Sequence, residues 1–287
     1  MKKQANFNVS SYIRREQLDG LELFSGSFDS HAFKPHFHEC YTIVFVKEGV
    51  GDYSTKRNKL IVPSGSILLL TPYEVHTGKS VDGYRWGFLT AYVPKELVDL
   101  AYRQLQGSSL YNEYITPRFK NKILVNQSLF NLGLDTFTNL SIDNDPLTAK
   151  SQLLQFLQVF LHISNDLDEP NHLLTGQQSV SLVKDYLHDH FSEEITIEQL
   201  CHISGLTEFS LIKSFKRYFD LPPHQYLINL RVEKAKQLLK QPVSSAHIAY
   251  QVGFYDQSHF IRHFKNIVGV TPKKFKDQKV AHQYILK

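Results

Sequence analysis

The sequence has 287 residues, 42% hydrophobic and 21% charged, which is the composition of an ordinary soluble protein with room for two domains. It contains no apolar run of the roughly 18–20 residues that a membrane-spanning helix needs, and its N-terminal lysines are not followed by the apolar stretch of a secretion signal. The net charge of +4 divides unevenly, because residues 209–287 contain 14 Lys and Arg against four Asp and Glu. This basic C-terminal part favours nucleic acid as a partner.

Residues 20–93 contain short β-rich runs separated by turn-forming sequences. The runs cover residues 41–46, 60–62, 66–70 and 84–89, and turns are predicted at 48–52, 63–65, 71–72 and 82–83. Many short strands at this spacing indicate a sandwich or barrel rather than alternating βαβ units.

Helical periodicity begins near residue 94. Residues 146–163 place six apolar side chains largely on one stripe, namely Leu147, Leu153, Leu154, Leu157, Phe160 and Leu161. Such a stripe packs on its own domain or, in a second interpretation, forms the seam of a homodimer. We therefore predict an N-terminal domain over 1–163, a polar linker over 164–177 and an all-helical domain over 178–287. The two cysteines, Cys40 and Cys201, fall in different domains, so we expect free thiols and a cytoplasmic location.

One helix-turn-helix pattern occurs twice in the helical domain. Each copy has a helix with a small residue, a glycine four positions later (Gly205 and Gly253), and then a second helix with regularly spaced apolar residues. The copies are 48 residues apart before the turn and 49 after it. Thr196 with Gln199 forms a capping box, and Thr207, Ser244, Asp256 and Thr271 are further predicted N-caps. Residues 224–240 form an uninterrupted helix that joins the copies. Two such units in tandem indicate two recognition helices for one DNA duplex.

The two copies resemble the signature of the AraC/XylS family of bacterial transcription regulators over roughly residues 180–276. The second copy carries the resemblance most closely, in residues 249–254, 258–265 and 269–272. The resemblance implies a bihelical domain whose recognition helices enter adjacent major-groove segments. It also implies base-facing positions at Phe209, Ile212 and Lys213 in the first helix and at Gln257, Ser258, Ile261 and Arg262 in the second.

The chemistry of these positions differs between the two helices. Arg262 suits a bidentate pair with guanine and Gln257 suits adenine, whereas Phe209 and Ile212 suit thymine methyl groups or packing. Lys213 replaces the arginine usual in the family, so it offers a point charge in place of a fork. Lys216, Arg217 and Lys265, one turn further along, are expected to hold phosphates. The family implies RNA polymerase as a partner, but His247 stands where the family often has an acidic residue.

The N-terminal half resembles the AraC-type cupin sensor domain, through residues 35–39, 48–49, 62–65 and 72–76. We expect a cupin-like β-barrel with flanking helices that binds a small-molecule effector, such as an amino acid or another small polar metabolite. The expected lining is His36, His38, Glu39, Tyr41, Glu74, His76 and Trp86. Two alternatives stay open for the three histidines. In the first, the histidines are ligands of a metal ion, although the glutamate of the enzymatic cupins is replaced by Thr42 or Ile43. In the second, the histidines form hydrogen bonds in the core.

These features predict a sequence-specific transcription regulator that responds to an effector, without enzymatic activity and without a cofactor. Three other classes of protein remain as alternatives. They are a metal-dependent cupin enzyme with a DNA-binding tail, a DNA-repair protein with a reactive cysteine, and a ligand-independent architectural DNA binder. Cys40, with no neighbouring cysteine and no basic surround, disfavours the repair protein.

Overall fold

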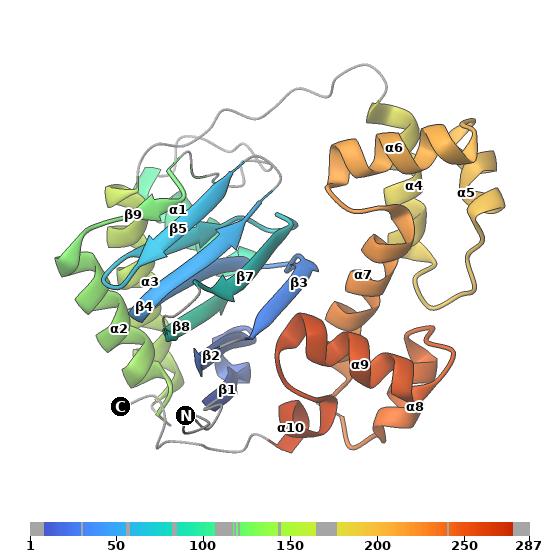
Figure 1. Ribbon diagram of the computed structural model, residues 1–287. Coiled ribbons are helices and arrows are strands. Elements are labelled where there is room, and N and C mark those ends of the chain that lie inside the picture. The colour runs from blue at the N-terminus through green and yellow to red at the C-terminus, as the bar shows by residue number, and fades with distance from the viewer. Residues whose placement is uncertain are drawn as a thin grey trace, which may run out of the picture. The chain divides into compact units, whose positions relative to one another are not determined.

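The computed structural model describes residues 9–29, 31–55, 58–81, 85–106, 117, 119, 121–142, 145–164, 177–239 and 241–277 (Figure 1). Within these residues the chain divides into two compact units. The first contains the sheet and three helices and extends to residue 164, and the second holds the helices from residue 177 onward together with residues 33–37. No described helix combines the length and the apolar character that crossing a membrane requires. Cys40 and Cys201 form no disulfide, as expected.

Antiparallel pairing builds the first unit. The main path of the sheet runs β1 (Val9–Arg15), β2 (Leu21–Phe28), β8 (Trp86–Val93), β4 (Tyr41–Ser54), β6 (Ile67–Leu70) and β9 (Ile123–Leu124). A 3-10 turn, η1 (Glu16–Leu18), joins β1 to β2. Off this path, β5 (Lys59–Pro63) and β7 (His76–Ser80) pair with the second half of β4, and β3 (Ala32–His36) pairs with β7.

The sheet-rich fold is confirmed, but two details of the prediction are wrong. Among the described strands β1 and β9 are the unjoined ends of the path, so the expected barrel is not closed. The predicted turn at 48–52 lies inside β4, which continues past a bulge between Val46 and Glu48. Gly49 takes a φ of +70°, and a Cβ atom there would lie 1.6 Å from the carbonyl oxygen of Arg85. Glycine therefore permits one long strand to serve both halves of the sheet.

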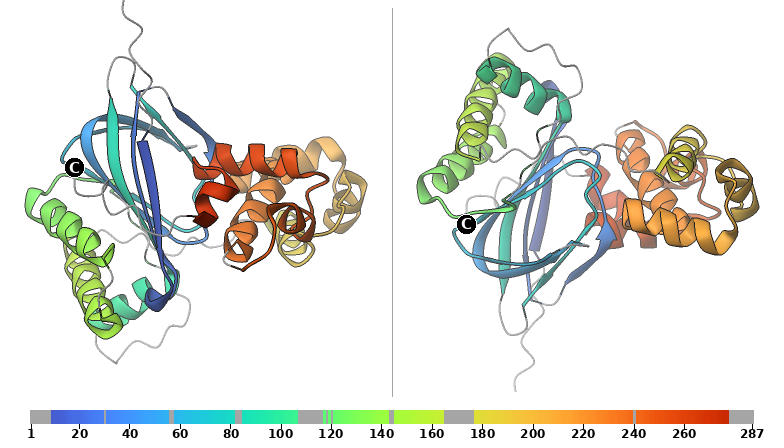
Figure 2. Two further views of the ribbon diagram at one scale, coloured as in Figure 1. Left: turned by 90° about the horizontal axis from the view of Figure 1, so that it is seen from below. Right: turned by 90° about the horizontal axis from the view of Figure 1, so that it is seen from above.

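Three helices cover one face of the sheet: α1 (Lys95–Gln106), α2 (Gln127–Leu140) and α3 (Pro146–Ile163) (Figure 2). The core between them and the sheet is rich in aromatic rings, and Phe45 of β4 contacts Phe137 and Phe156 with ring centroids 5.8 and 6.4 Å apart. The bounds predicted for α3 are confirmed. Its stripe is only partly right, since Leu147 is 75% exposed and the buried Phe156 was not predicted.

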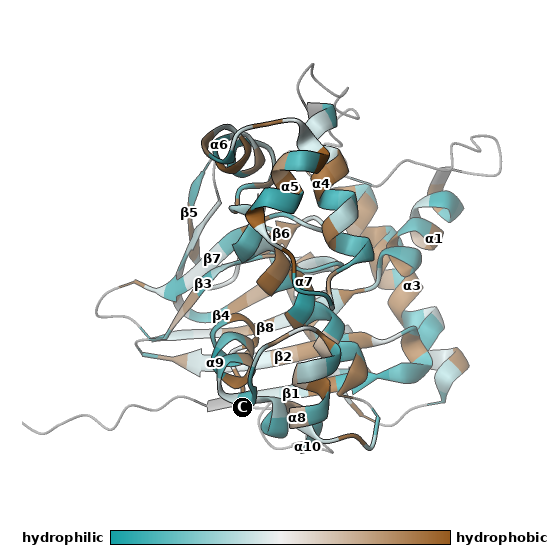
Figure 3. Ribbon diagram, turned by 90° about the vertical axis from the view of Figure 1, so that its right-hand side faces the viewer, coloured by the Kyte–Doolittle hydropathy of each residue, from teal (hydrophilic) through white to brown (hydrophobic). Residues whose placement is uncertain are grey.

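The second unit consists of helices throughout the described residues after 176. They are α4 (Gln177–Asp189), α5 (Ile197–Ser204), α6 (Glu208–Phe219), α7 (Pro223–Leu238), α8 (Ser245–Gln251), α9 (Gln257–Val268) and α10 (Pro272–Asp277). Helices α5 and α6 form the first helix-turn-helix motif, and α8 and α9 the second. In the hydropathy colouring the strands β6 and β8 are largely brown, whereas α8 and α9 carry both colours, as amphipathic helices do (Figure 3).

The local signals read from the sequence are confirmed in this unit. Thr196 and Gln199 form the predicted capping box at α5. The hydroxyl or carboxylate oxygens of Thr207, Ser244 and Asp256 accept backbone N–H bonds at the starts of α6, α8 and α9. Thr271 does the same before Pro272. The glycine of each turn lies in the left-handed region, with φ of +67° at Gly205 and +86° at Gly253.

Candidate DNA-binding surface and effector site

Helix α6 presents a basic face with two exposed apolar side chains to solvent, because its core residues are spaced to face inward. Leu211 and Phe215 are completely buried. The predicted contact residues Phe209, Ile212, Lys213, Lys216 and Arg217 are all exposed. Phe209 is 76% exposed, and the Lys213 ammonium lies 5.9 Å from the centre of its ring. A large aromatic side chain left in water beside a cation is typical of a surface that another molecule covers.

Helix α9 repeats this arrangement in the second motif. Phe260 and Phe264 are buried, whereas the predicted contact residues Gln257, Ser258, Arg262 and Lys265 are exposed and Ile261 is half-buried. Asp256 caps the helix by accepting from the His259 N–H at 2.8 Å. The exposed residues of α9 therefore form one face of a rigid, well-capped helix.

Two exposed tyrosines in the second motif were missed in the sequence. Tyr250 in α8 is 80% exposed, and Tyr255, which directly precedes the N-cap of α9, is 97% exposed. Tyr250 falls within the signature stretch 249–254, and Tyr255 lies just outside it. The available signal was their place between apolar core positions, because Ala249 and Phe254 beside them are buried.

One buried arginine connects the two motifs through α7. Arg231 donates from Nε to the carbonyl of Phe191 and from Nη2 to that of Glu193, both at 2.7 Å. Its guanidinium also lies 6.0 Å from the ring centre of Phe254 in the second motif. Burial lowers the pKa of Arg231, but an arginine stays charged at neutral pH. The segment before α5 and the turn after α8 are thus held to one side chain.

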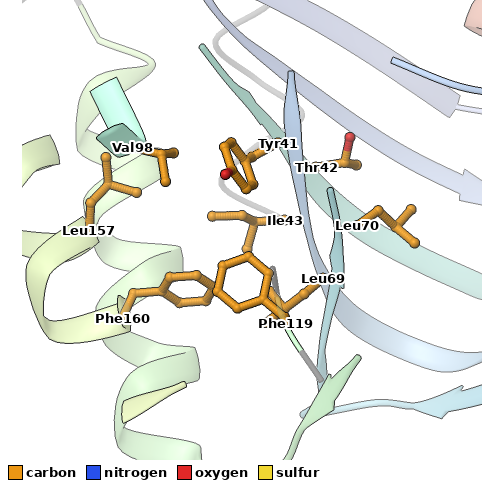
Figure 4. A pocket seen from close by; sticks show the side chains of 9 residues that line it. All are labelled: Tyr41, Thr42, Ile43, Leu69, Leu70, Val98, Phe119, Leu157 and Phe160. Carbon is orange, nitrogen blue, oxygen red and sulfur yellow. The ribbon is translucent and has the colours of Figure 1, made fainter. Parts of the chain in front are cut away.

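The two faces of the N-terminal sheet have different partners. Strand alternation directs Tyr41 and Ile43 of β4 toward the helices, and Figure 4 shows them in a small apolar pocket together with Leu69, Phe119 and Phe160. The Tyr41 hydroxyl donates to the carbonyl of Pro117 at 2.9 Å. Tyr41 therefore lies in the helix-facing core. Placing it in one cavity with the imidazoles was wrong, because neighbouring residues of a strand point to opposite faces and Tyr41 takes the helix side.

The opposite face carries a polar cluster that sequence reasoning did not find, consisting of Tyr12, Arg14, Glu22 and Tyr92. Glu22 is 5% exposed and accepts hydrogen bonds from the Tyr12 hydroxyl and the Arg14 guanidinium. Burial alone would lower the pKa of Arg14, but the charges of Glu22 and Glu16 outweigh it and raise that pKa. Tyr92 is the register partner of Glu22. Alternating polar residues in β1 and β2 were the only sequence signal for this cluster.

The histidine cluster of His36, His38 and His76 adjoins the polar cluster. All three side chains are buried, and one ligand atom from each lies within 4.8 Å of the other two. The His38 ring lies 5.3 Å from that of His76 and 4.6 Å from that of Tyr92, between centroids. The structure thus brings together the three histidines singled out in the sequence.

The remaining predicted lining residues have other surroundings. The Glu74 carboxylate accepts from the Thr71 backbone and hydroxyl at 3.1 Å and from Lys122 at 2.7 Å, so a loop and a salt bridge engage it. Glu39 is half-buried. Trp86 packs against Phe88 and Tyr53, at 4.4 and 5.3 Å between ring centroids. Burial raises the pKa of Tyr53 well above its ordinary value. This end of the face is aromatic, whereas the end with Glu22 is polar.

Comparison with known proteins finds a family model for each of the two units and relatives that contain both. The model of the AraC-like ligand binding domain matches residues 20–157, and that of a helix-turn-helix domain matches residues 200–278. The HTH-type transcriptional regulator YbfI of Bacillus subtilis is 26% identical over 79% of this chain and 81% of its own length. The transcriptional activator RhaS of Escherichia coli is 25% identical over 84% of this chain and 86% of its own length.

A solved structure extends the similarity to the fold of nearly the whole chain. Fatty acid-bound ToxT from Vibrio cholerae matches with a TM-score of 0.57 and 17% identity, over 96% of this chain and 99% of that one. The ligand-binding and helix-turn-helix domains occur together here, and the exposed faces of α6 and α9 lie in the second. The chain belongs to the AraC family of transcription regulators, which join a DNA-binding helix-turn-helix domain to a domain that binds an effector.

Proposed function

We propose that α6 and α9 read two successive major-groove segments of one operator. The observation that carries this proposal is that α6 and α9 each expose one face to solvent. The opposite face of each helix packs into the core through two buried side chains, Leu211 and Phe215 in α6 and Phe260 and Phe264 in α9. A basic surface attracts the phosphate backbone of any sequence, and side chains at base edges supply the discrimination. The basic charge of the C-terminal part supports attraction to the phosphate backbone. The polar face of α9 supports discrimination between bases.

The second motif contributes more of the sequence discrimination than the first. Arg262 donates a bidentate pair to guanine, and Gln257 pairs with adenine. Phe209 and Ile212 offer apolar contacts to thymine methyl groups, and Lys213 adds a charge without a fixed fork. Lys216, Arg217 and Lys265 hold phosphates, while Ser258 and Ile261 complete the base-facing side of α9.

The test compares binding to a selected operator and to random DNA. Arg262→Ala is expected to weaken operator binding by about 1–3 kcal/mol and to relax one base position, while binding to random DNA changes less. Lys265→Ala serves as the matched control on the same helix, and it is expected to weaken both by similar factors. Equal losses on both DNAs for Arg262→Ala would make Arg262 a phosphate contact and would remove the proposed readout.

The effector is a small polar metabolite, of which an amino acid is the favoured class. The half-buried guanidinium of Arg14 and the buried carboxylate of Glu22 support this choice, because groups of both signs suit a ligand that carries both. His36, His38, His76, Glu39, Glu74 and Trp86 complete the proposed site around the polar cluster. The effector changes DNA affinity only to the extent that it binds the two functional states differently.

A thermal-shift screen against amino acids, sugars and organic acids tests the effector class. A ligand at 100 times its dissociation constant adds about 2.7 kcal/mol of stability, which is readily measured. His36→Ala is expected to abolish the effector response and to leave DNA binding without effector intact. An unchanged dose response would remove His36 from the site, and a hit restricted to fatty acids would replace the polar class by that bound to ToxT.

Four further assignments belong to this proposal. RNA polymerase is the protein partner at the promoter. A second copy of the chain pairs through α3, where Val159 and Ile163, four residues apart on one face, reach the solvent. The functional boundaries are 1–163, 164–177 and 178–287. The effector is released unchanged, without enzymatic turnover. Sedimentation equilibrium tests the dimer, and Ile163→Glu is expected to weaken it.

A further inference from the structure

We propose that Tyr255 is a further specificity-determining residue, whose ring contacts the methyl group of a thymine at the edge of the DNA segment read by α9. This inference rests on the proposed function, because it adds a residue to the DNA-binding surface of the second motif. Three observations carry it: the place of Tyr255 in the repeated pattern, the packing of the residues beside it, and its exposure to solvent.

The turn of the second motif is one residue longer than the turn of the first. In the first motif a single residue, Leu206, separates the turn glycine from the N-cap of α6. In the second motif two residues, Phe254 and Tyr255, separate the turn glycine from the N-cap of α9. The two turn glycines are therefore 48 residues apart and the two N-caps 49 residues apart. One of the two aromatic residues is an insertion relative to the first motif.

The packing of Phe254 identifies Tyr255 as the inserted residue. An apolar residue directly before an N-cap often packs against the fourth residue of the helix, which in α9 is the buried Phe260. Here Phe254 makes that contact, with the two ring centroids 5.3 Å apart. The Phe254 backbone N–H also donates to the carbonyl of Ala249 at 2.9 Å, which fixes the turn. Phe254 thus fills the packing position that Leu206 precedes in the first motif, and Tyr255 is added after it.

The side chain of Tyr255 is almost completely in solvent. Its exposed fraction of 97% is the largest among the exposed large hydrophobic residues in the part of the chain that the structure describes. A single exposed aromatic residue needs no special explanation by itself. Tyr255, however, directly precedes the N-cap of the helix whose exposed residues are proposed to read bases. Because its ring adds little packing to the fold, replacing it changes contacts with a partner more than it changes stability.

The order of residues along α9 locates the expected contact on the DNA. In a helix-turn-helix motif the N-terminal residues of the recognition helix contact base edges. Gln257 is the first residue of α9, Arg262 follows five residues later, and Tyr255 precedes both. Each residue advances about 1.5 Å along a helix axis. The base contacted by Tyr255 is therefore expected beside that of Gln257, on the side away from that of Arg262.

The chemistry of the tyrosine ring suits one feature of the major groove. Thymine is the only base that presents a C5-methyl group there, and apolar side chains contact it. The tyrosine hydroxyl suits a phosphate instead, and a phosphate contact carries no sequence information. The place of Tyr255 at the N-terminal end of α9 favours the base edge, whereas Lys265 near the other end of the helix is the proposed phosphate contact. Tyr255→Phe separates the two chemistries, because it removes the hydroxyl and keeps the ring.

The experiment measures binding of the full chain to an operator that the wild-type protein selects from random sequences. Each thymine of this operator is replaced in turn by uracil, which forms the same base pair without the methyl group. Loss of the contacted methyl group is expected to weaken wild-type binding by about fourfold, at one position beside that read by Gln257. Tyr255→Ala is expected to bind the thymine operator about fourfold more weakly or worse, with no further loss when that uracil is present. Tyr255→Phe is expected to keep the wild-type response.

Tyr250→Ala is the matched control, because it removes a second exposed tyrosine of the same motif from α8. It is expected to leave the response to every uracil unchanged. Tyr255→Ala with wild-type affinity and wild-type response to uracil overturns the inference. Equal losses for Tyr255→Phe and Tyr255→Ala on operator and random DNA also overturn it, since they assign the hydroxyl to a phosphate.

Failure of this inference is distinguishable from failure of the proposed function. A wild-type chain that selects no DNA sequence overturns the proposed function, and the role of Tyr255 with it. A selected operator whose recognition depends on Arg262 but not on Tyr255 overturns the role of Tyr255 alone.

Discussion

The turn glycines of the two motifs allow a matched pair of substitutions, Gly205→Ala and Gly253→Ala. Both residues have a positive φ, so alanine brings left-handed strain of about 1–2 kcal/mol at either site. Reduced freedom of the unfolded chain offsets about 0.4–1 kcal/mol of it. We therefore expect a common cost near 1 kcal/mol from the backbone alone.

The surroundings of the two glycines differ, and this difference adds a steric contribution to the loss in free energy of unfolding. A Cβ atom at Gly205 meets nothing within 4 Å, whereas at Gly253 it would lie 2.8 Å from the Ser192 carbonyl oxygen and 2.9 Å from the Arg231 guanidinium. Arg231 cannot move away without breaking its hydrogen bonds to the carbonyls of Phe191 and Glu193. Overpacking of this kind costs about 1–3 kcal/mol. Gly253→Ala is therefore expected to cost about 2 kcal/mol more than Gly205→Ala.

Urea unfolding followed by far-UV circular dichroism measures this difference, read from the transition of the helical unit because a chain of two units need not unfold in one step. Binding to operator DNA, measured in parallel, is expected to fall more for Gly253→Ala, since the displaced Arg231 contacts the second motif. Equal free energies of unfolding for the two variants would refute the steric argument and reduce both effects to backbone strain.

Three further results are expected. Arg231→Met removes two hydrogen bonds from a charged donor, each worth about 1.5–3 kcal/mol, but it also removes the cost of burying that charge. We therefore expect the free energy of urea unfolding to fall by about 2–4 kcal/mol. An unchanged midpoint of unfolding would show that Arg231 does not hold these segments together. Burial, with the charges of His259 and Arg262, lowers the pKa of His263 from 6.5 to about 4, so the unfolded chain gains a proton first and stability falls as the pH drops from about 6.5 to 4. After discounting for solvent screening of this partly exposed ring, the loss of stability is about 1–2 kcal/mol. His263→Asn should flatten that part of the pH–stability curve. An equally steep curve in the variant would assign the pH dependence to other groups. Lys216→Ala should reduce the slope of log affinity against log salt by about 1 on operator and random DNA alike, and an unchanged slope would remove this phosphate contact.

The helical unit was predictable from the sequence because its signals are local. Side chains that cap helices, such as Thr207 and Asp256, act within three residues, and Gly253 meets a conformational demand of its own turn. Helical spacing likewise separates buried Phe260 from exposed Arg262 without reference to any distant segment. The brace made by Arg231 was not predictable, because its partners lie about 40 residues earlier and are backbone carbonyls.

The sheet was harder to predict because its contacts join distant residues. Gly49 resembles a turn residue, yet its neighbour Arg85 belongs to another strand and turns the site into a bulge within β4. Tyr41 and Thr42 are adjacent and point to opposite faces, so a shift of one residue in the assumed register moves Tyr41 from the helix side to the polar side. The pairing of Glu22 with Tyr92 depends on the register of β2 and β8, which no local pattern specifies.

The claim that both motifs read one operator is tested most directly by footprinting the full chain on a DNA site selected from random sequences. Two exposed recognition helices on one domain predict two protected major-groove segments on the same face of the duplex, about one helical turn or 34 Å apart. Changing Arg262 should remove protection and base preference in one segment only, and changing Lys213 should affect the other. A single protected segment that responds to both substitutions would contradict the account.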